Sequence, residues 1–179
     1  LTLLMRGTPS IYYGQELGMR GRIDAKVKSD GAHIGLREAY RWSADLGAPG
    51  SAIWYRNDAT AWGSRFNRSN DGVSLAEERG KLGSLYAFYR TLLALRAARP
   101  ELRQGDQQLL CDDGSTAVCV LRSMGGHKVL VLANSGAVAV RPALPVMGYG
   151  WVDLLDDNRG VDPATVELSP YGLRVLGTH

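Results

Sequence analysis

The sequence predicts an α+β protein in which the end of an α/β repeat precedes a separate antiparallel β-sandwich. Residues 74–98 carry apolar side chains at helical spacing, whereas the residues after Pro100 alternate with a period of two. Before residue 100 the expected order is helix, strand, long loop and helix, which is typical of the last unit of an α/β repeat. We therefore expect two domains, residues 1–99 and residues 100–179.

The composition limits the classes of function. The chain has 179 residues, 45% of them apolar, which is enough for the core of one large or two small globular domains. Its net charge of +3 comes from 21 basic and 18 acidic residues that are scattered along the chain. No basic run of the kind that follows a phosphate backbone is present, and no apolar run approaches the ~20 residues of a transmembrane helix. We expect neither a nucleic-acid partner nor a membrane span.

The first part of the chain combines regular and irregular stretches. We expect LTLLMR at residues 1–6 to end a helix and SIYY at residues 10–13 to form a strand. Residues 14–72 are rich in Gly, Asp, Asn, Arg and Trp and show little periodicity. So long an irregular stretch inside a compact domain is usually functional.

Residues 74–98 are predicted to form one helix. Ser74 and Glu77 match a capping box, which satisfies free amide groups of the first turn. Gly80 and Gly83 weaken the first turns, and Pro100 is expected to end the helix. The predicted apolar face consists of Leu82, Leu85, Phe88, Tyr89, Leu92 and Leu95.

After Pro100, short β-prone runs alternate with turn-like segments such as MGG, NSG and SPYG. Such spacing indicates an antiparallel sandwich, and KVLVLA at residues 128–133 is apolar on both faces, as in a central strand. The expected strands are residues 107–110, 117–122, 128–133, 138–141, 151–155, 165–168 and 172–176.

The two cysteines, Cys111 and Cys119, flank a turn-like DDGST segment. We expect two buried free thiols rather than a disulfide, because the spacing does not guarantee a bridge. The cysteines therefore do not decide whether the protein is secreted, periplasmic or cytoplasmic.

Three ordered motifs resemble glycoside hydrolase family 13, the α-amylase family. GTPSIYYGQELGM at residues 7–19 resembles the stretch at the family's eighth barrel strand, and LREAYRW at residues 36–42 resembles an Arg-Glu-Pro-Phe-x-Trp motif in the loop that follows. The chain departs from that motif with Ala39 for Pro and Tyr40 for Phe. Residues 74–102 resemble the eighth barrel helix, which leads into a C-terminal β-sandwich.

The resemblance implies that residues 1–99 are the end of a (β/α)8 TIM barrel and residues 100–179 a C-terminal sandwich. In this family two carboxyl groups about 5 Å apart cleave α-glucosides with retention. The three catalytic carboxylates of the family have no counterpart in this sequence and would lie upstream of Leu1. The resemblance thus implies an α-glucan or maltooligosaccharide substrate for the complete protein, and no activity for this chain alone. It also implies that the rest of the barrel must pack against residues 1–98.

Arg37 and Trp42 are the predicted substrate-binding residues, because the resemblance places their loop beside the cleft and because sugars bind to aromatic rings and planar donors. The same residues could instead fix the loop to the barrel, and Trp54 and Trp62 are weaker candidates. Glu16 with Asp24 could form a catalytic carboxylate pair, but a structural ion pair or hydrogen bond is the preferred interpretation.

A metal site is not expected, because no carboxylate or cysteine accompanies the histidines at useful spacing. The histidines are His33, His127 and His179. Many amylases bind calcium through a domain inserted early in the barrel, so calcium is possible in the complete protein and is not expected in this chain.

Two other classes of function stay open. The chain could come from an amylase-like protein without catalysis that binds a partner protein. Alternatively, the sandwich could be a carbohydrate-binding module with a stacking platform made by Tyr149, Trp151 or Tyr171. For Trp151 the preferred interpretation is a core residue at the start of a strand.

Overall fold

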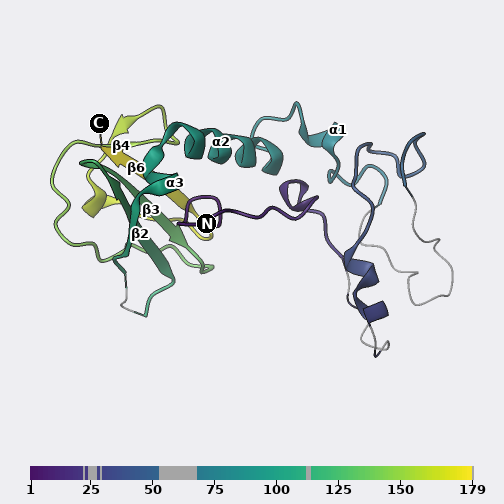
Figure 1. The fold of residues 1–179 in the computed structure, drawn as a ribbon, viewed down its shortest axis with the longest axis horizontal. Coiled ribbons are helices and arrows are strands. Elements are labelled where there is room, and N and C mark those ends of the chain that lie inside the picture. Colours follow the sequence, from purple (N-terminus) through teal and green to yellow (C-terminus); the bar gives the residue numbers. More distant parts are fainter. Residues whose placement is uncertain (22, 24–27, 29, 53–67, 112–113, 179) are drawn as a thin grey trace. The chain divides into compact units, whose positions relative to one another are not determined.

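The computed structural model describes residues 1–21, 23, 28, 30–52, 68–111 and 114–178. The chain divides into two compact units, residues 1–10 with 92–179 and residues 11–91. The first unit is built on a β-sheet, whereas the second contains short helices and turns (Figure 1). None of the helices among these described residues is long and apolar enough to cross a bilayer.

In the part of the chain that the structure describes, the first unit has one antiparallel sheet of six strands in the order β1-β2-β3-β6-β4-β5. The central strand β3 pairs with β2 and β6, and its last six residues are buried, which confirms the expectation for KVLVLA. The strands are β1 (Asp106–Leu109), β2 (Ala117–Met124), β3 (His127–Asn134), β4 (Trp151–Asp153), β5 (Arg159–Gly160) and β6 (Leu173–Thr178).

One face of the sheet carries the hydrophobic core. Three neighbouring strands each contribute a buried side chain to this face: Cys119 from β2, Leu130 from β3 and Leu176 from β6. These side chains pack with Trp151, which is only 2% exposed. The interpretation of Trp151 as a core residue at the start of a strand is confirmed. The layer that covers this face comes from residues 140–147 and 161–168.

That covering layer is irregular, so the predicted strands 138–141 and 165–168 are wrong. Only one isolated bridge forms there, between Val140 and Leu168, and Pro163–Thr165 form the short 3-10 helix η3. Pro142 and Pro145 lack the amide that a strand must donate to its neighbour, which explains why no second sheet forms among the described residues.

The opposite face of the sheet is covered by α3 (Pro100–Gln104), which contacts β2 and β3. Pro100, which the sequence pattern predicts to end a helix, instead begins α3, which that pattern does not predict. Proline is well tolerated at the first position of a helix, because the amide that it lacks would be unpaired there anyway. The buried residues on this face of the sheet are Val120, Arg122, Val129, Val131 and Val175.

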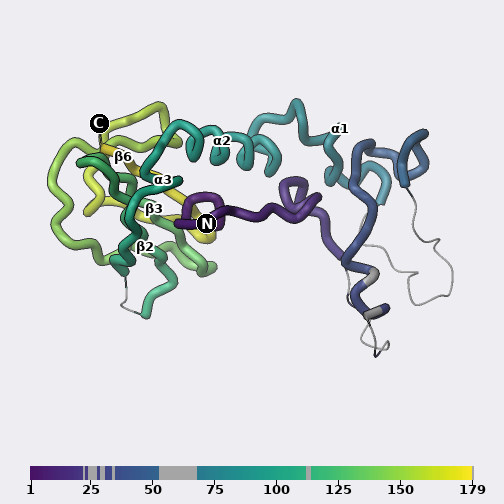
Figure 2. Tube along the Cα trace, viewed as in Figure 1, coloured from purple at the N-terminus to yellow at the C-terminus, as the bar shows by residue number. Residues whose placement is uncertain are grey.

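Two buried arginines hold residues 1–7 against α3 and the sheet. Arg122 is fully buried and donates to the carbonyls of Leu4, Leu102 and Gly105 at 3.1, 3.0 and 2.9 Å. Arg96 donates to the carbonyls of Leu3, Met5, Gly7 and Leu102. The N-terminal segment, purple in Figure 2, accordingly lies beside α3 and the strands.

The expected helix end at residues 1–6 is therefore wrong. Only a turn forms, in which the amide of Leu4 donates to the carbonyl of Leu1 at 2.7 Å. The carbonyls of Leu3, Leu4 and Met5 accept hydrogen bonds from arginine side chains, so backbone amides are not needed as their partners.

The predicted strand SIYY is also absent in the second unit. Residues 8–12 have no regular structure, and a turn at Tyr13 and Gly14 leads into the 3-10 helix η1 (Gln15–Leu17). A parallel strand needs neighbouring strands to pair its backbone, and no strand lies among residues 1–21. A second 3-10 helix, η2, follows at Asp30–Leu36.

The predicted helix 74–98 is two helices, α1 (Leu75–Glu78) and α2 (Leu85–Ala98). The capping box is confirmed, because Ser74 Oγ accepts from the amide of Glu77 at 3.2 Å. The break coincides with Gly83, whose φ of 74° is incompatible with a right-handed helix. Leu82 lies in this break and is 97% exposed, so its assignment to the helical face is wrong.

Cys111 and Cys119 form a disulfide with a Cα–Cα distance of 5.2 Å, so the expectation of free thiols is wrong. Antiparallel pairing of β1 with β2 continues to Leu110, whose amide donates to the carbonyl of Cys119 at 2.8 Å. This register, which the spacing of the two residues does not reveal, brings both side chains within bonding range.

Candidate functional site

The candidate site lies in the second unit, where the turn around η1 meets the LREAYRW segment. Gly14 and Gly18 flank η1 with φ of 82° and 70°, the left-handed region that favours glycine. A Cβ atom at Gly14 would meet the side chain of Met19, and its positive φ strains any other residue, so this tight turn favours glycine. The turn presents Glu16 to the segment that follows η2.

Tyr40 joins the two segments. Its hydroxyl group donates to Glu16 Oε1 at 2.8 Å, and Glu16 Oε2 is shielded from solvent. Burial, followed by the hydrogen bond and the charge of Glu16, raises the pKa of Tyr40 well above its ordinary value. Glu16 thus makes a hydrogen bond, as the structural interpretation expects, but to Tyr40; its suggested partner Asp24 lies outside the described residues.

Arg41 fixes the LREAYRW segment to the residues before α1. It is 4% exposed, and its Nη2 atom donates to the carbonyls of Ala44 and Arg68 at 3.2 and 2.9 Å. The same nitrogen lies 3.6 Å from the carboxylate of Asp71. The amide of Leu75 donates to the Arg41 carbonyl, so the start of α1 is tied to this residue as well.

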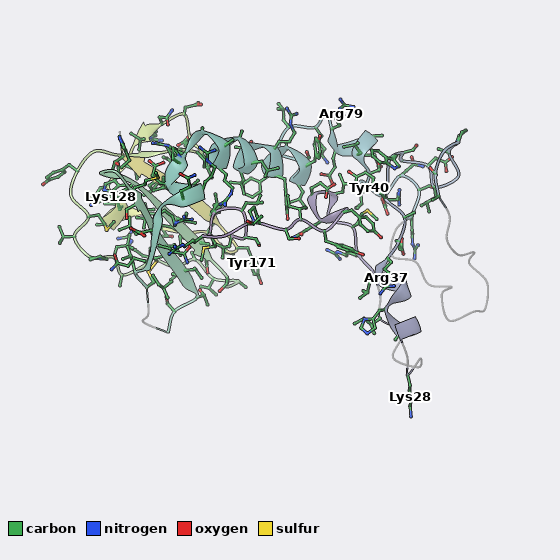
Figure 3. All side chains as sticks on the ribbon, viewed as in Figure 1. Lys28, Arg37, Tyr40, Arg79, Lys128 and Tyr171 are labelled. Atoms are coloured by element: carbon green, nitrogen blue, oxygen red, sulfur yellow. A yellow bond between two sulfur atoms is a disulfide. The ribbon has the colours of Figure 1, made fainter. Side chains whose placement is uncertain are left out.

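The two predicted substrate-binding residues are both exposed. The Trp42 side chain is 61% exposed, and its ring meets the ring of Tyr40 edge to face, with a centroid distance of 4.5 Å. Arg37 lies close enough to Tyr13 that its charge opposes the increase in the pKa of Tyr13 caused by burial and by the hydrogen bond with Tyr12. Figure 3 shows Arg37 and Tyr40 on the same part of the chain. The weaker candidates Trp54 and Trp62 lie outside the described residues.

Two recesses border these residues, and the buried carboxylate Glu38 lines both of them. The recess beside Tyr40 and Trp42 has a volume of about 20 Å³, which suffices for little more than one water molecule. The recess beside Tyr12, Tyr13 and Leu36 measures about 230 Å³. This larger recess has aromatic walls and polar groups, which are the features of a small polar ligand site.

Several residues of this site are not predicted from the sequence. They are Tyr13, Glu38, Tyr40 and Arg41. The signal that could have found Arg41 is its place between two aromatic residues in a segment that otherwise lacks apolar periodicity. A charged residue in such a segment is either exposed or buried beside polar partners, and only the fold decides which.

The described residues contain no group of three or more His, Cys, Asp or Glu side chains that could hold a metal ion. His33 and His127 are both exposed and lie in different units, and His179 falls outside the described residues. In the first unit, Tyr149 and Tyr171 are exposed, unlike the core residue Trp151.

Comparison with known proteins defines the class of this chain. The family profile described as "Alpha amylase, catalytic domain" matches residues 1–105. The class is that of the glycoside hydrolases. More narrowly, the chain belongs to the alpha-amylase family, because this match covers more than half of its residues.

Three curated relatives are similar to the chain. Trehalose synthase of Thermus thermophilus is 31% identical over 150 residues, which are 83% of this chain and 15% of that protein. A probable alpha-glucosidase of Rhizobium meliloti is 28% identical over 92% of this chain and 31% of its own length. Alpha-amylase 3 of Dictyoglomus thermophilum is 26% identical over 74% of this chain and 23% of its own length.

Solved structures show the same fold. Amy13B of Eubacterium rectale has a TM-score of 0.71 at 24% identity, over 99% of this chain and 32% of that chain. Trehalulose synthase MutB of Pseudomonas mesoacidophila MX-45 has a TM-score of 0.66 at 22% identity, over 98% of this chain and 36% of that chain. The chain thus spans between 15% and 36% of these relatives.

Proposed function

We propose that this chain is the C-terminal part of an α-amylase-type glycoside hydrolase that cleaves α-glucosidic bonds of starch-derived glucans with retention. The family match over residues 1–105 carries the proposal. In it, residues 1–99 complete a (β/α)8 barrel and residues 100–179 form the C-terminal domain. The carboxylates that cleave the bond belong to polypeptide upstream of Leu1.

Exposed apolar side chains in the second unit support the need for further barrel polypeptide. Leu85 and Phe88 on α2, and Ile11, Tyr12 and Tyr13 before η1, are each more than a third exposed. Apolar residues clustered at helical spacing are normally buried, and neighbouring barrel strands and helices would cover them.

We further propose that Trp42 and Arg37 bind the substrate. A half-exposed indole ring held by Tyr40, itself fixed by Glu16, is a rigid stacking surface for a sugar ring. The Arg37 guanidinium supplies planar donors for sugar hydroxyl groups. A calcium requirement stays a proposal for the complete protein, and loss of activity in EDTA with recovery in calcium would establish it.

The test compares the complete protein with the 179-residue chain. The complete protein should hydrolyse maltotriose or p-nitrophenyl α-glucoside, and NMR should show that the first product is the α-anomer, whereas the 179-residue chain should release nothing. Release of the β-anomer, or turnover by the 179-residue chain, would contradict the proposal. A complete protein without any turnover would favour a partner-binding role instead.

The site residues need their own measurement. In the complete protein, Trp42→Ala should raise KM about tenfold with a smaller effect on kcat, because stacking binds substrate and transition state alike. The matched control is Tyr149→Ala, which removes an exposed ring from the first unit. An unchanged KM in Trp42→Ala would remove Trp42 from the site.

A further inference from the structure

Tyr171 in the first unit has an unusual backbone. Its φ is 54°, in the left-handed region where a bulky side chain is strained, and its side chain is 71% exposed. The conformation is held by two hydrogen bonds, from the Tyr171 amide to the Gly136 carbonyl at 3.0 Å and from the Gly172 amide to the Ser169 carbonyl at 2.9 Å. Strain at an exposed aromatic residue is a reason to look for a ligand.

The support beneath Tyr171 is rigid because of Asn134, which is 3% exposed. Its side-chain amide donates to the carbonyls of Val138 and Ser169 at 2.7 and 3.0 Å. Its Oδ1 atom accepts from Thr116 Oγ1 and from the Gly136 amide at 2.7 and 2.8 Å. One buried side chain therefore fixes three loops at one end of the sheet.

These three loops, residues 114–118, 134–140 and 168–172, form what we call the neutral surface. None of their residues is charged. Charged ligands have no counter-charge on these loops, whereas sugars are bound by aromatic rings and uncharged hydrogen-bonding groups. The exposed members are Gly114, Ser115, Thr116, Ser135, Ala137, Val138, Ala139, Ser169, Pro170 and Tyr171.

We propose that the neutral surface is a second carbohydrate-binding site, in which a ring of an α-glucan chain stacks on Tyr171. The rigid loops reduce the loss of conformational freedom on binding, which favours a stable contact through a single aromatic ring. The identification of the polymer as an α-glucan rests on the proposed function. The preference for an uncharged sugar rests only on the composition of the loops. The site holds the polymer and takes no part in bond cleavage.

The test is affinity electrophoresis of the 179-residue chain through native gels with and without amylopectin. Tyr171→Gly is the informative variant, because glycine adopts a φ of 54° without strain and the backbone hydrogen bonds are retained. Its apparent Kd for amylopectin should rise about tenfold or more. Tyr149→Gly is the matched control, since Tyr149 is fully exposed and lies outside the neutral surface, and it should bind like the unmodified chain.

Each other result overturns the proposal. An unmodified chain that amylopectin does not retard has no such site, and equal retardation of Tyr171→Gly excludes Tyr171. Equal loss in Tyr149→Gly means that binding is unspecific, and equal retardation by hydroxyethyl cellulose means that the surface does not select α-glucans. If size-exclusion chromatography shows a dimer that is lost in Tyr171→Gly, the neutral surface is occupied by a second copy of the chain.

Failure of the proposed function can be told apart from failure of this inference. Hydrolysis of maltotriose should be the same in the complete protein and in its Tyr171→Gly variant, because the neutral surface takes no part in bond cleavage. A complete protein that hydrolyses nothing contradicts the proposed function, while the gel retardation of the 179-residue chain still decides the role of Tyr171.

Discussion

Tyr40 and Glu16, which are 24 positions apart, are joined by a hydrogen bond of 2.8 Å between the phenolic oxygen and Glu16 Oε1. Tyr40 stands where the motif that this segment resembles has Phe, and it is the added hydroxyl group that makes this bond. The bond connects the η1 turn with the segment that carries Trp42, and the Tyr40 ring also contacts the Trp42 ring. A single side chain thereby links a partly buried carboxylate to the proposed sugar-stacking residue.

Tyr40→Phe should lower the free energy of unfolding by about 1 kcal/mol, because Glu16 Oε1 loses its donor while it stays partly buried. Urea denaturation measures the change, and Tyr149→Phe on an exposed ring is the control. In a Glu16→Ala background the same Tyr40→Phe change should cost almost nothing. An equal cost in both backgrounds would show that the hydrogen bond does not couple the two residues.

Alkaline titration should detect Tyr40 directly. Its pKa and that of Tyr13 are raised, so absorbance near 295 nm should show late-ionising tyrosines, and Tyr40→Phe should remove part of that late phase. Because the folded chain favours the neutral phenol, the stability from Tyr40 is complete below the ordinary tyrosine pKa of about 10 and is lost as pH rises through the folded value. A late phase of unchanged size in Tyr40→Phe would contradict this.

The disulfide between Cys111 and Cys119 should stabilise the first unit by about 2–3 kcal/mol, as the chain-entropy relation gives for a short loop. The measurement compares the unmodified chain with a Cys111→Ala, Cys119→Ala double variant, which leaves no single thiol behind. Thiol titration in denaturant should find no free thiol before reduction. Free thiols in the unreduced chain would contradict the bridge.

Arg122 should be one of the most sensitive positions in the first unit. Arg122→Met should lower the free energy of unfolding by about 3 kcal/mol or more, because several buried carbonyls lose their donor together. Arg122→Lys should not restore stability, since one amine cannot reach carbonyls that three guanidinium nitrogens serve. Arg103→Met on the exposed side of α3 should change little, and an equal cost at both positions would contradict this role.

The sequence by itself determined the features that depend on local order. Short β-prone runs marked β1, β2, β4 and β6, and a run that is apolar on both faces marked β3. The Gly125 and Gly126 pair marked the turn between β2 and β3, and Ser74 with Glu77 marked the start of α1. The family followed from three motifs in order. Each of these signals is read within a few neighbouring residues, so no distant contact was needed to recognise it.

Only the tertiary structure decided the features that depend on partners far along the chain. The helix end expected at residues 1–6 became a turn because Arg96 and Arg122, about ninety or more residues away, bind its carbonyls. SIYY remained irregular, since a strand exists only with a neighbour to pair with. Three further features arise where separate segments meet: the disulfide, the hydrogen bond between Tyr40 and Glu16, and the support of the Tyr171 loop by Asn134. The spacing of residues along the sequence does not give the distances between such segments.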